Sequence, residues 1–217
     1  MKIITKLLLS VLTLGFVAGC SSIFGGDEDL SKDPSFVQLR NANVNFIEAK
    51  RWAQKISKPY DKSIDAKADA EIEAVNNSNN PAQLQENRGS NDDIAGSLKD
   101  AAQNSAIAKQ NFEKSAGYFF KGIASETALV ASVTKRVQDL KAQIEKASPM
   151  EKMSLTKQIS PLTAILDLAQ NDLKNMATTS KLYIDYATKN GIDIKSIQNN
   201  ADKEALQKAN EITAANK

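Results

Sequence analysis

Two long apolar stripes constrain the fold more than any other feature of the sequence. From Phe112 to Ile144, and again from Leu155 to Ala187, the stripe positions are separated alternately by four and three residues. The first stripe consists of Phe112, Ala116, Phe119, Ile123, Glu126, Val130, Val133, Val137, Leu140 and Ile144, and the second of Leu155, Ile159, Leu162, Leu166, Ala169, Leu173, Met176, Ser180, Tyr183 and Ala187. This is the heptad pattern of helices that pack along a seam. Glu126 is the one charged stripe residue, and its sequence neighbours could rotate into its place.

The two stripes mirror each other around Ser148-Pro149. Stripe residues whose numbers add to 299 form pairs, from Ile144 with Leu155 to Phe112 with Ala187. Pairs with a constant sum lie level with each other when two helices run antiparallel. The sequence therefore predicts a long antiparallel helical hairpin that turns near Ser148-Pro149.

The ends of the second hairpin helix carry recognisable signals. Ser148 is a suitable N-cap, Pro149 suits the first helical position, and Glu151 can complete a capping box. Asn190-Gly191 is expected to end the helix, because glycine adopts the left-handed cap conformation. Pro161 is expected to kink this helix or to begin it afresh.

A hairpin cannot bury both of its faces alone, so a third long helix is needed. The periodic apolar residues of Phe36–Ser57 predict that helix. A short helix is expected over 60–75, with Tyr60 on its apolar face, and another around 201–214. The segment 76–93 has almost no apolar residue and predicts a long, mobile loop. The predicted fold is all-α: an elongated bundle of three main helices, built on the hairpin, with minor helices.

The residue types present do not favour catalysis. The chain has no histidine and one cysteine, Cys20, so it lacks the commonest general base and an intramolecular disulfide. Phosphate-binding glycine loops and the Gly-x-Ser-x-Gly motif are absent from the sequence. Asp61–Ile72 begins like a calcium loop, but Lys67 and Ile72 occupy positions that need oxygen ligands. We therefore expect no enzyme activity, no cofactor and no metal site.

Residues 1–19 have the three parts of a secretory signal peptide. Lys2 and Lys6 supply the positive start, 7–17 is a short apolar run, and Ala18 and Gly19 are small residues suited to cleavage. The run is shorter than the ~20 residues that span a bilayer. Removing this segment leaves 26 of the 28 basic residues against 26 acidic ones. A neutral mature chain gives no electrostatic reason to expect nucleic-acid binding.

The signal ends in Val17-Ala18-Gly19-Cys20, which resembles the lipobox of bacterial lipoproteins. The resemblance covers about the first 22 residues and implies that Cys20 receives a diacylglycerol and, after cleavage, an N-acyl chain such as palmitate. Several acyl chains anchor a protein stably. Ser21 in the next position implies sorting to the outer membrane, facing the periplasm, and exposure at the cell surface stays open.

The segment after the cysteine has the composition of a tether. Within 20–35, Gly25-Gly26 favours flexibility, Asp27-Glu28-Asp29 favours solvation, and Asp33-Pro34 discourages helix. The sequence therefore divides into a signal peptide (1–19), a lipidated flexible tether (20–35) and a helical domain (36–217).

Tyr118, Phe119 and Phe120 form the densest aromatic cluster, and Gly117 and Gly122 flank it. At helical spacing such residues usually belong to a core. An exposed Tyr118 or Phe120 would instead be a candidate contact for a partner, because large exposed aromatics favour interfaces.

These observations predict a noncatalytic, outer-membrane-anchored lipoprotein that acts as a scaffold or accessory component of an envelope or secretion assembly, with a protein partner. Two alternatives stay open. One is a periplasmic carrier of an apolar ligand between splayed helices. The other, less favoured, is a cell-wall enzyme that uses a pair of carboxylates. The heptads could also support self-association.

Overall fold

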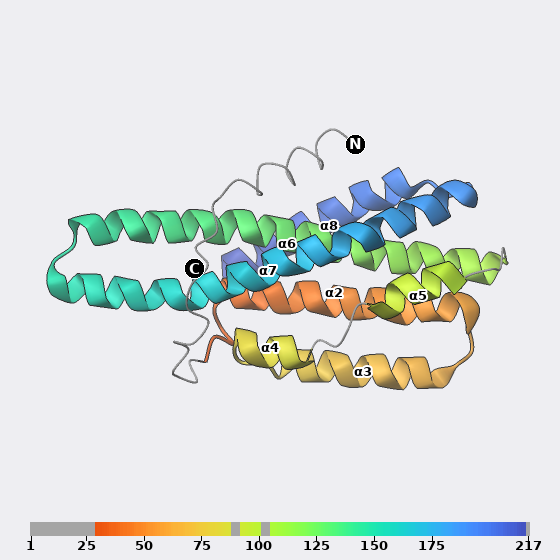
Figure 1. Ribbon diagram of the computed structural model, residues 1–217, viewed down its shortest axis with the longest axis horizontal. Coiled ribbons are helices and arrows are strands. Elements are labelled where there is room, and N and C mark those ends of the chain that lie inside the picture. The colour runs from red at the N-terminus through yellow and green to blue at the C-terminus, as the bar shows by residue number, and fades with distance from the viewer. Residues whose placement is uncertain (1–28, 88–91, 101–104, 216–217) are drawn as a thin grey trace.

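The computed structural model describes residues 29–87, 92–100 and 105–215, and this part of the chain is all-α (Figure 1). Cys20 and Ser21 lie outside the described residues. The helices are α2 (Pro34–Ser57), α3 (Lys62–Asn76), α4 (Pro81–Asn87), α5 (Asp92–Asp100), α6 (Ala106–Lys146), α7 (Pro149–Lys189) and α8 (Ile194–Ala215). The predicted elongated bundle is confirmed. Its helix α8 begins earlier than the expected 201–214 and packs along α6.

The predicted hairpin is formed by α6 and α7, which have 41 residues each and are about 60 Å long. Contacts near its open end fix the antiparallel register. The hydroxyls of Ser115 and Tyr183 lie 2.6 Å apart, and the rings of Phe112 and Tyr186 stack with centroids 4.4 Å apart. The numbers of both pairs add to 298, one less than the sum on which the prediction rests.

The signals at both ends of α7 act as predicted. The Glu151 carboxylate accepts from the backbone N–H of Ser148 at 2.9 Å and from its hydroxyl at 2.7 Å. These bonds lower the pKa of Glu151. At the other end Gly191 has a φ of 65°, and the N–H of Ile192 donates to the carbonyl of Ala187 at 2.9 Å. This is the left-handed glycine ending in which helix carbonyls gain donors.

The structure corrects the prediction at Tyr60 and decides between the alternatives left open at Pro161 and Glu126. Helix α7 does not begin afresh at Pro161, because it runs through this residue from Pro149 to Lys189. Tyr60 precedes α3 and is 81% exposed, so it is not on the apolar face of that helix. Glu126 stays on the seam, fully buried, and its neighbours do not replace it.

The segment 76–93, predicted as a loop, contains α4, and α5 begins within it. The side chain of Asn80 accepts from the N–H of Gln83 at 3.0 Å, and Pro81 occupies the first helical position. Leu84 then enters the core and is fully buried. One buried leucine and a well-formed N-terminus are therefore enough for a short helix here.

Helix α2 runs antiparallel to α6 at close range. Asn111 donates to the carbonyl of Lys55 at 2.8 Å, and Ser115 donates to that of Ala49 at 2.6 Å. Short polar side chains reach the neighbouring backbone only where two helices approach closely. Burial raises the pKa of Tyr183, so its hydroxyl stays neutral beside Ser115.

The core consists of two apolar clusters along the rod. Glu126 on α6 and Asp172 on α7 are buried between them. Glu126 follows Ser115 by eleven positions, and Asp172 precedes Tyr183 by eleven. The register that joins Ser115 to Tyr183 therefore places the two carboxyl groups at one level of the hairpin. Asn43 of α2 is also buried, and its side chain donates to the Leu39 carbonyl at 3.0 Å.

Helix α3 docks on α2 through both apolar contacts and ion pairs. Its buried apolar residues are Ile64, Ala68 and Val75. The remaining contacts to α2 include ion pairs: Lys50 with Glu71, Arg51 with Asp69, and Lys55 with Asp65. The Lys50 side chain is 4% exposed, whereas that of Asp69 is 68% exposed.

Gly122 and Gly117 should respond in opposite ways to alanine. A Cβ at Gly122 would lie 2.5 Å from Cε1 of Phe46, whereas one at Gly117 meets nothing within 4 Å. Gly122→Ala is therefore expected to lower the free energy of unfolding by about 1–3 kcal/mol, because the Phe46 ring must move in a packed core. Gly117→Ala, the matched control in the same helix, should raise it by up to about 1 kcal/mol. Urea denaturation measures both, and equal effects would contradict the close packing at Gly122.

Candidate functional site

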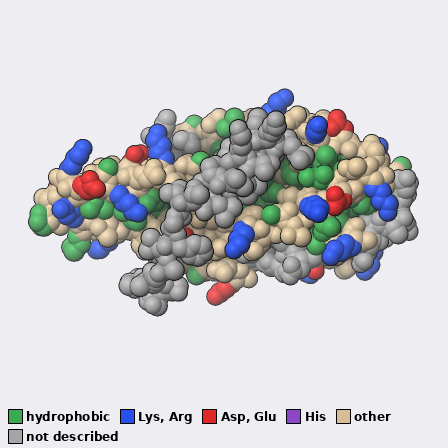
Figure 2. All heavy atoms as spheres, turned by 45° about the horizontal axis from the view of Figure 1, so that its top comes forward, with side chains coloured by type: hydrophobic (Ala, Val, Ile, Leu, Met, Phe, Trp, Pro, Cys, Tyr) green, Lys and Arg blue, Asp and Glu red, His purple; other side chains and the backbone are tan. Residues whose placement is uncertain are grey.

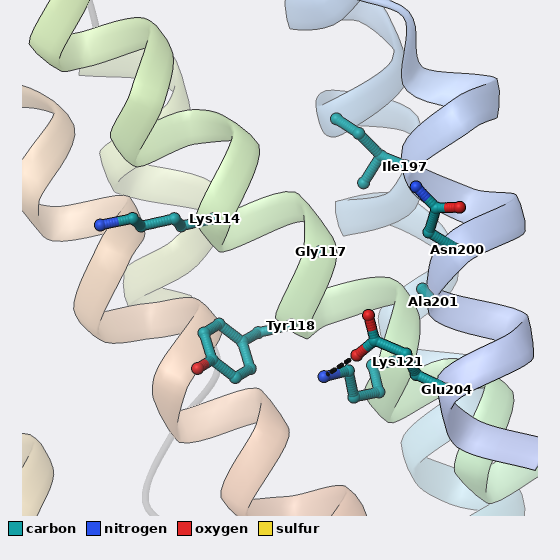
Figure 3. Close-up of a pocket in the computed structure, with 8 residues that line it drawn as sticks. All are labelled: Lys114, Gly117, Tyr118, Lys121, Ile197, Asn200, Ala201 and Glu204. Atoms are coloured by element: carbon teal, nitrogen blue, oxygen red, sulfur yellow. Dashed lines mark ion pairs between the residues drawn. The ribbon is translucent and has the colours of Figure 1, made fainter. Parts of the chain in front are cut away.

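A shallow groove lies between α6 and α8 and has a volume of about 220 Å³ (Figure 3). Four of its lining residues come from one face of α6 and four from the facing side of α8. They are Lys114, Gly117, Tyr118, Lys121, Ile197, Asn200, Ala201 and Glu204. The absent side chain of Gly117 leaves the space open, since a Cβ there would meet no atom within 4 Å.

The cations of this groove are engaged with neighbouring groups. Lys121 forms an ion pair with Glu204 across the groove and lies over the Tyr118 ring, its Nζ 5.3 Å from the centroid. Lys114 reaches toward α2, where its Nζ lies 4.0 Å from the centroid of the Trp52 ring. Such cation–π contacts hold the lysines against the helices. The groove therefore presents a mixed polar and aromatic surface.

A second hollow of about 380 Å³ continues along α8, where α2, α6 and α8 meet. It shares Lys121 and Glu204 with the first groove and is lined mostly by polar side chains: Asn41, Val44, Asn45, Lys121, Ser125, Glu204, Ala205, Gln207, Lys208 and Glu211. Both hollows are open to solvent. Their open shape suits docking of another surface better than enclosure of an apolar ligand.

The two aromatic residues singled out from the sequence differ in position. Tyr118 is half-buried and lines the groove, so it is available for contact there. Phe120 is 6% exposed, and its ring packs on Phe119 at 5.5 Å and on Tyr183 at 5.9 Å between centroids. Phe120 therefore belongs to the core, and its interpretation as a contact residue is wrong.

Sequence reasoning missed a second surface, at the closed end of the hairpin. Met150 is 82% exposed and Met153 is 63% exposed. Between Leu140 and Leu162, the nearest buried residues on either side, none of residues 141–161 is buried. Figure 2 shows hydrophobic side chains among charged ones at this narrow end of the molecule. The sequence did contain a signal for this surface. Met150 and Met153 are large apolar residues that do not belong to either stripe, so the predicted seam has no place for them.

Two kinds of site are not found in the described residues. No group of three or more acidic, histidine or cysteine side chains is placed to hold a metal ion in the part of the chain that the structure describes. None of the helices α2 to α8 combines the length and apolar character needed to cross a bilayer.

The chain matches no known family model, no curated protein and no solved structure.

Proposed function

We propose that this chain is a noncatalytic lipoprotein, anchored through Cys20 to the outer membrane, that acts as a scaffold in an envelope or secretion assembly. The observation that carries the proposal is the run Val17-Ala18-Gly19-Cys20 at the end of a signal-like segment. Ser21 supports sorting to the outer membrane, with the helical body in the periplasm. The elongated bundle and its mixed polar and aromatic groove between α6 and α8 support a docking role for that body.

The packing of the bundle gives less support to a ligand carrier. Phe112, Phe119 and Tyr183 are fully buried where the hairpin would have to part. The two hollows described above lie at the surface and are open to solvent, so neither encloses a ligand. A carrier of an apolar molecule needs an apolar cavity that encloses most of its ligand.

The acid pair also favours a noncatalytic role. Glu126 and Asp172 lie at one level, as a carboxylate enzyme would require, but they are 0% and 2% exposed inside the bundle. A glycosidase needs its two acids on either side of a cleft that admits the sugar. We therefore assign these residues to the core.

The anchor is tested by Cys20→Ser in the full chain. This change removes the thiol that would carry the diacylglycerol, so the protein is expected to leave the membrane fraction and to lose the mass of its acyl chains. Cell fractionation and intact-protein mass spectrometry measure both effects. Ser21→Asp is the matched variant: it should keep the lipid and stay at the inner membrane. An unmodified Cys20 in the starting protein would refute the anchor.

The scaffold role is tested by crosslinking in intact cells. A photoreactive amino acid at position 118 is expected to give a discrete crosslinked product with an envelope protein, because Tyr118 lines the groove. The same probe in place of Ile184, which is 40% exposed on α7, is the control. Absence of a product specific to position 118 would count against docking at this groove.

A further inference from the structure

The closed end of the hairpin, residues 141–161, has the chemistry of a membrane-contacting surface. We call this segment the hairpin tip. It carries Met150 and Met153 on the first turns of α7, exposed at 82% and 63%. Four lysines and two glutamates are its only charged residues, a net charge of +2, namely Lys141, Glu145, Lys146, Glu151, Lys152 and Lys157. Glu151 accepts from Ser148 in the helix cap, so one of the two glutamates is engaged within the tip.

The tip lies at the end of the molecule where the described chain starts. Asp33, the N-cap of α2, accepts from Arg136 of α6 at 3.0 Å, so the start of α2 is level with Arg136. Lys146, the last residue of α6, is ten positions further on, or about 15 Å along the helix. In Figure 1 the hairpin extends beyond the start of α2 on this side. Helix α2 has 24 residues, so its opposite end, at Ser57, is about 35 Å from its start.

The short tether distinguishes these two ends. Leu30 is fixed to the body by donation of its N–H to the Asn79 carbonyl at 2.8 Å, and it follows Cys20 by ten positions. A chain of ten residues spans about 34 Å when fully extended and about 17 Å on average when flexible. An anchor at Cys20 therefore lets the tip reach the bilayer within the average span. The end that carries Tyr60 is at the limit of the extended span.

We propose that the hairpin tip docks on the bilayer into which the Cys20 lipid inserts. This inference rests on the proposed anchor. Met150 and Met153 enter the boundary between headgroups and acyl chains, and Lys146 and Lys152 contact anionic headgroups. Exposed apolar side chains beside lysines suit such a surface, and the tether holds it close. The rod then stands on its tip, and the α6–α8 groove on its side lies clear of the bilayer.

The test uses the full chain, purified from cells with its lipid and reconstituted into vesicles of equal parts phosphatidylethanolamine and phosphatidylglycerol. Because lipid occupies the Cys20 thiol, Ser154→Cys supplies the single free thiol for a fluorophore at the tip, with both methionines kept. Tyr60→Cys supplies the matched position at the opposite end. Quenching by spin-labelled phospholipid reports contact with the bilayer. Mass spectrometry first verifies the lipid on Cys20.

Quenching is expected at position 154 and absent at position 60. Met150→Gln with Met153→Gln should lower the ratio of docked to free tip by about tenfold. Each of Lys146→Gln and Lys152→Gln should lower it by about fivefold, and neutral phosphatidylcholine vesicles should abolish the lysine effect. Equal quenching at both positions, as from a rod lying flat, would overturn the proposal. The proposal would also be overturned if the protein carries its lipid but the fluorophore at position 154 is not quenched. A tip that contacts only another protein would give this result. If Cys20 carries no lipid, the proposed anchor fails as well. The mass of the purified protein distinguishes this failure from a failure of tip docking alone.

Discussion

Phe119→Ala is expected to lower the free energy of unfolding by about 3–5 kcal/mol. The Phe119 ring is fully buried where three long helices meet. Its centroid lies 6.0 Å from that of Phe46 on α2, 5.5 Å from that of Phe120 on α6 and 4.6 Å from that of Tyr183 on α7. Alanine leaves a cavity that none of these helices can fill without losing its other contacts. Urea denaturation followed by circular dichroism measures the loss.

Tyr118→Ala is the matched control for this prediction. Tyr118 is the preceding residue, with a ring of similar size that is only half-buried in the groove. Removal of the Tyr118 ring is expected to lower the free energy of unfolding by less than about 1 kcal/mol, because solvent already covers part of the ring. A loss at Phe119 no larger than that at Tyr118 would show that the aromatic contacts do not join the three helices.

The hairpin could be predicted because its information is local and repeated. Each step of the alternating spacing favours the same seam, and the signals at Ser148 and Gly191 set the ends of α7. The contact of Ser115 with Tyr183 confirms the predicted pairing to within one residue. Pro161 left a kink or a fresh start open, because a proline disfavours helix locally. The fresh start is excluded, since α7 continues through Pro161 and the adjacent Leu162 is buried in the core.

Short elements depend on single contacts and were harder to predict. Helix α4 has one buried residue, Leu84, so its sequence has no periodic stripe, although Asn80-Pro81 was a readable start signal. For Glu126 the sequence left open whether a neighbour would take its place on the seam. It stays buried because turning the helix to expose it would also expose Leu129 and Val133.

Which of the candidate residues is exposed could not be predicted, because exposure depends on which helix covers which face. Tyr118 and Phe120 are two positions apart in the sequence, but one lines the α6–α8 groove and the other packs on Tyr183. The exposure of Met150 and Met153 follows from the length of the hairpin beyond α2, which no local pattern encodes. The anchor at Cys20 is the opposite case: it is read from a contiguous motif and stays a prediction.

Glu71→Gln is expected to lower the free energy of unfolding by about 3 kcal/mol, because it leaves the Lys50 ammonium buried without its counter-charge. The Lys50 Nζ lies 2.5 Å from Glu71 Oε2, and the Lys50 side chain is 4% exposed. Denaturation in urea, which keeps ionic strength constant, is the measurement. Asp69→Asn in the same helix is the control: Asp69 pairs with Arg51 but is 68% exposed, so its loss should cost less than about 1 kcal/mol.

A second variant separates the missing charge pair from general damage to α3. Lys50→Met combined with Glu71→Gln removes both charges, so the double variant should recover most of the stability lost by Glu71→Gln alone. If the double variant regains this stability, the ion pair of Lys50 with Glu71 positions α3 on α2 but makes no large net contribution to the free energy of unfolding. No recovery would mean that Glu71 acts through contacts other than Lys50. Equal losses for Glu71→Gln and Asp69→Asn would show that burial of Lys50 does not control how α3 is held.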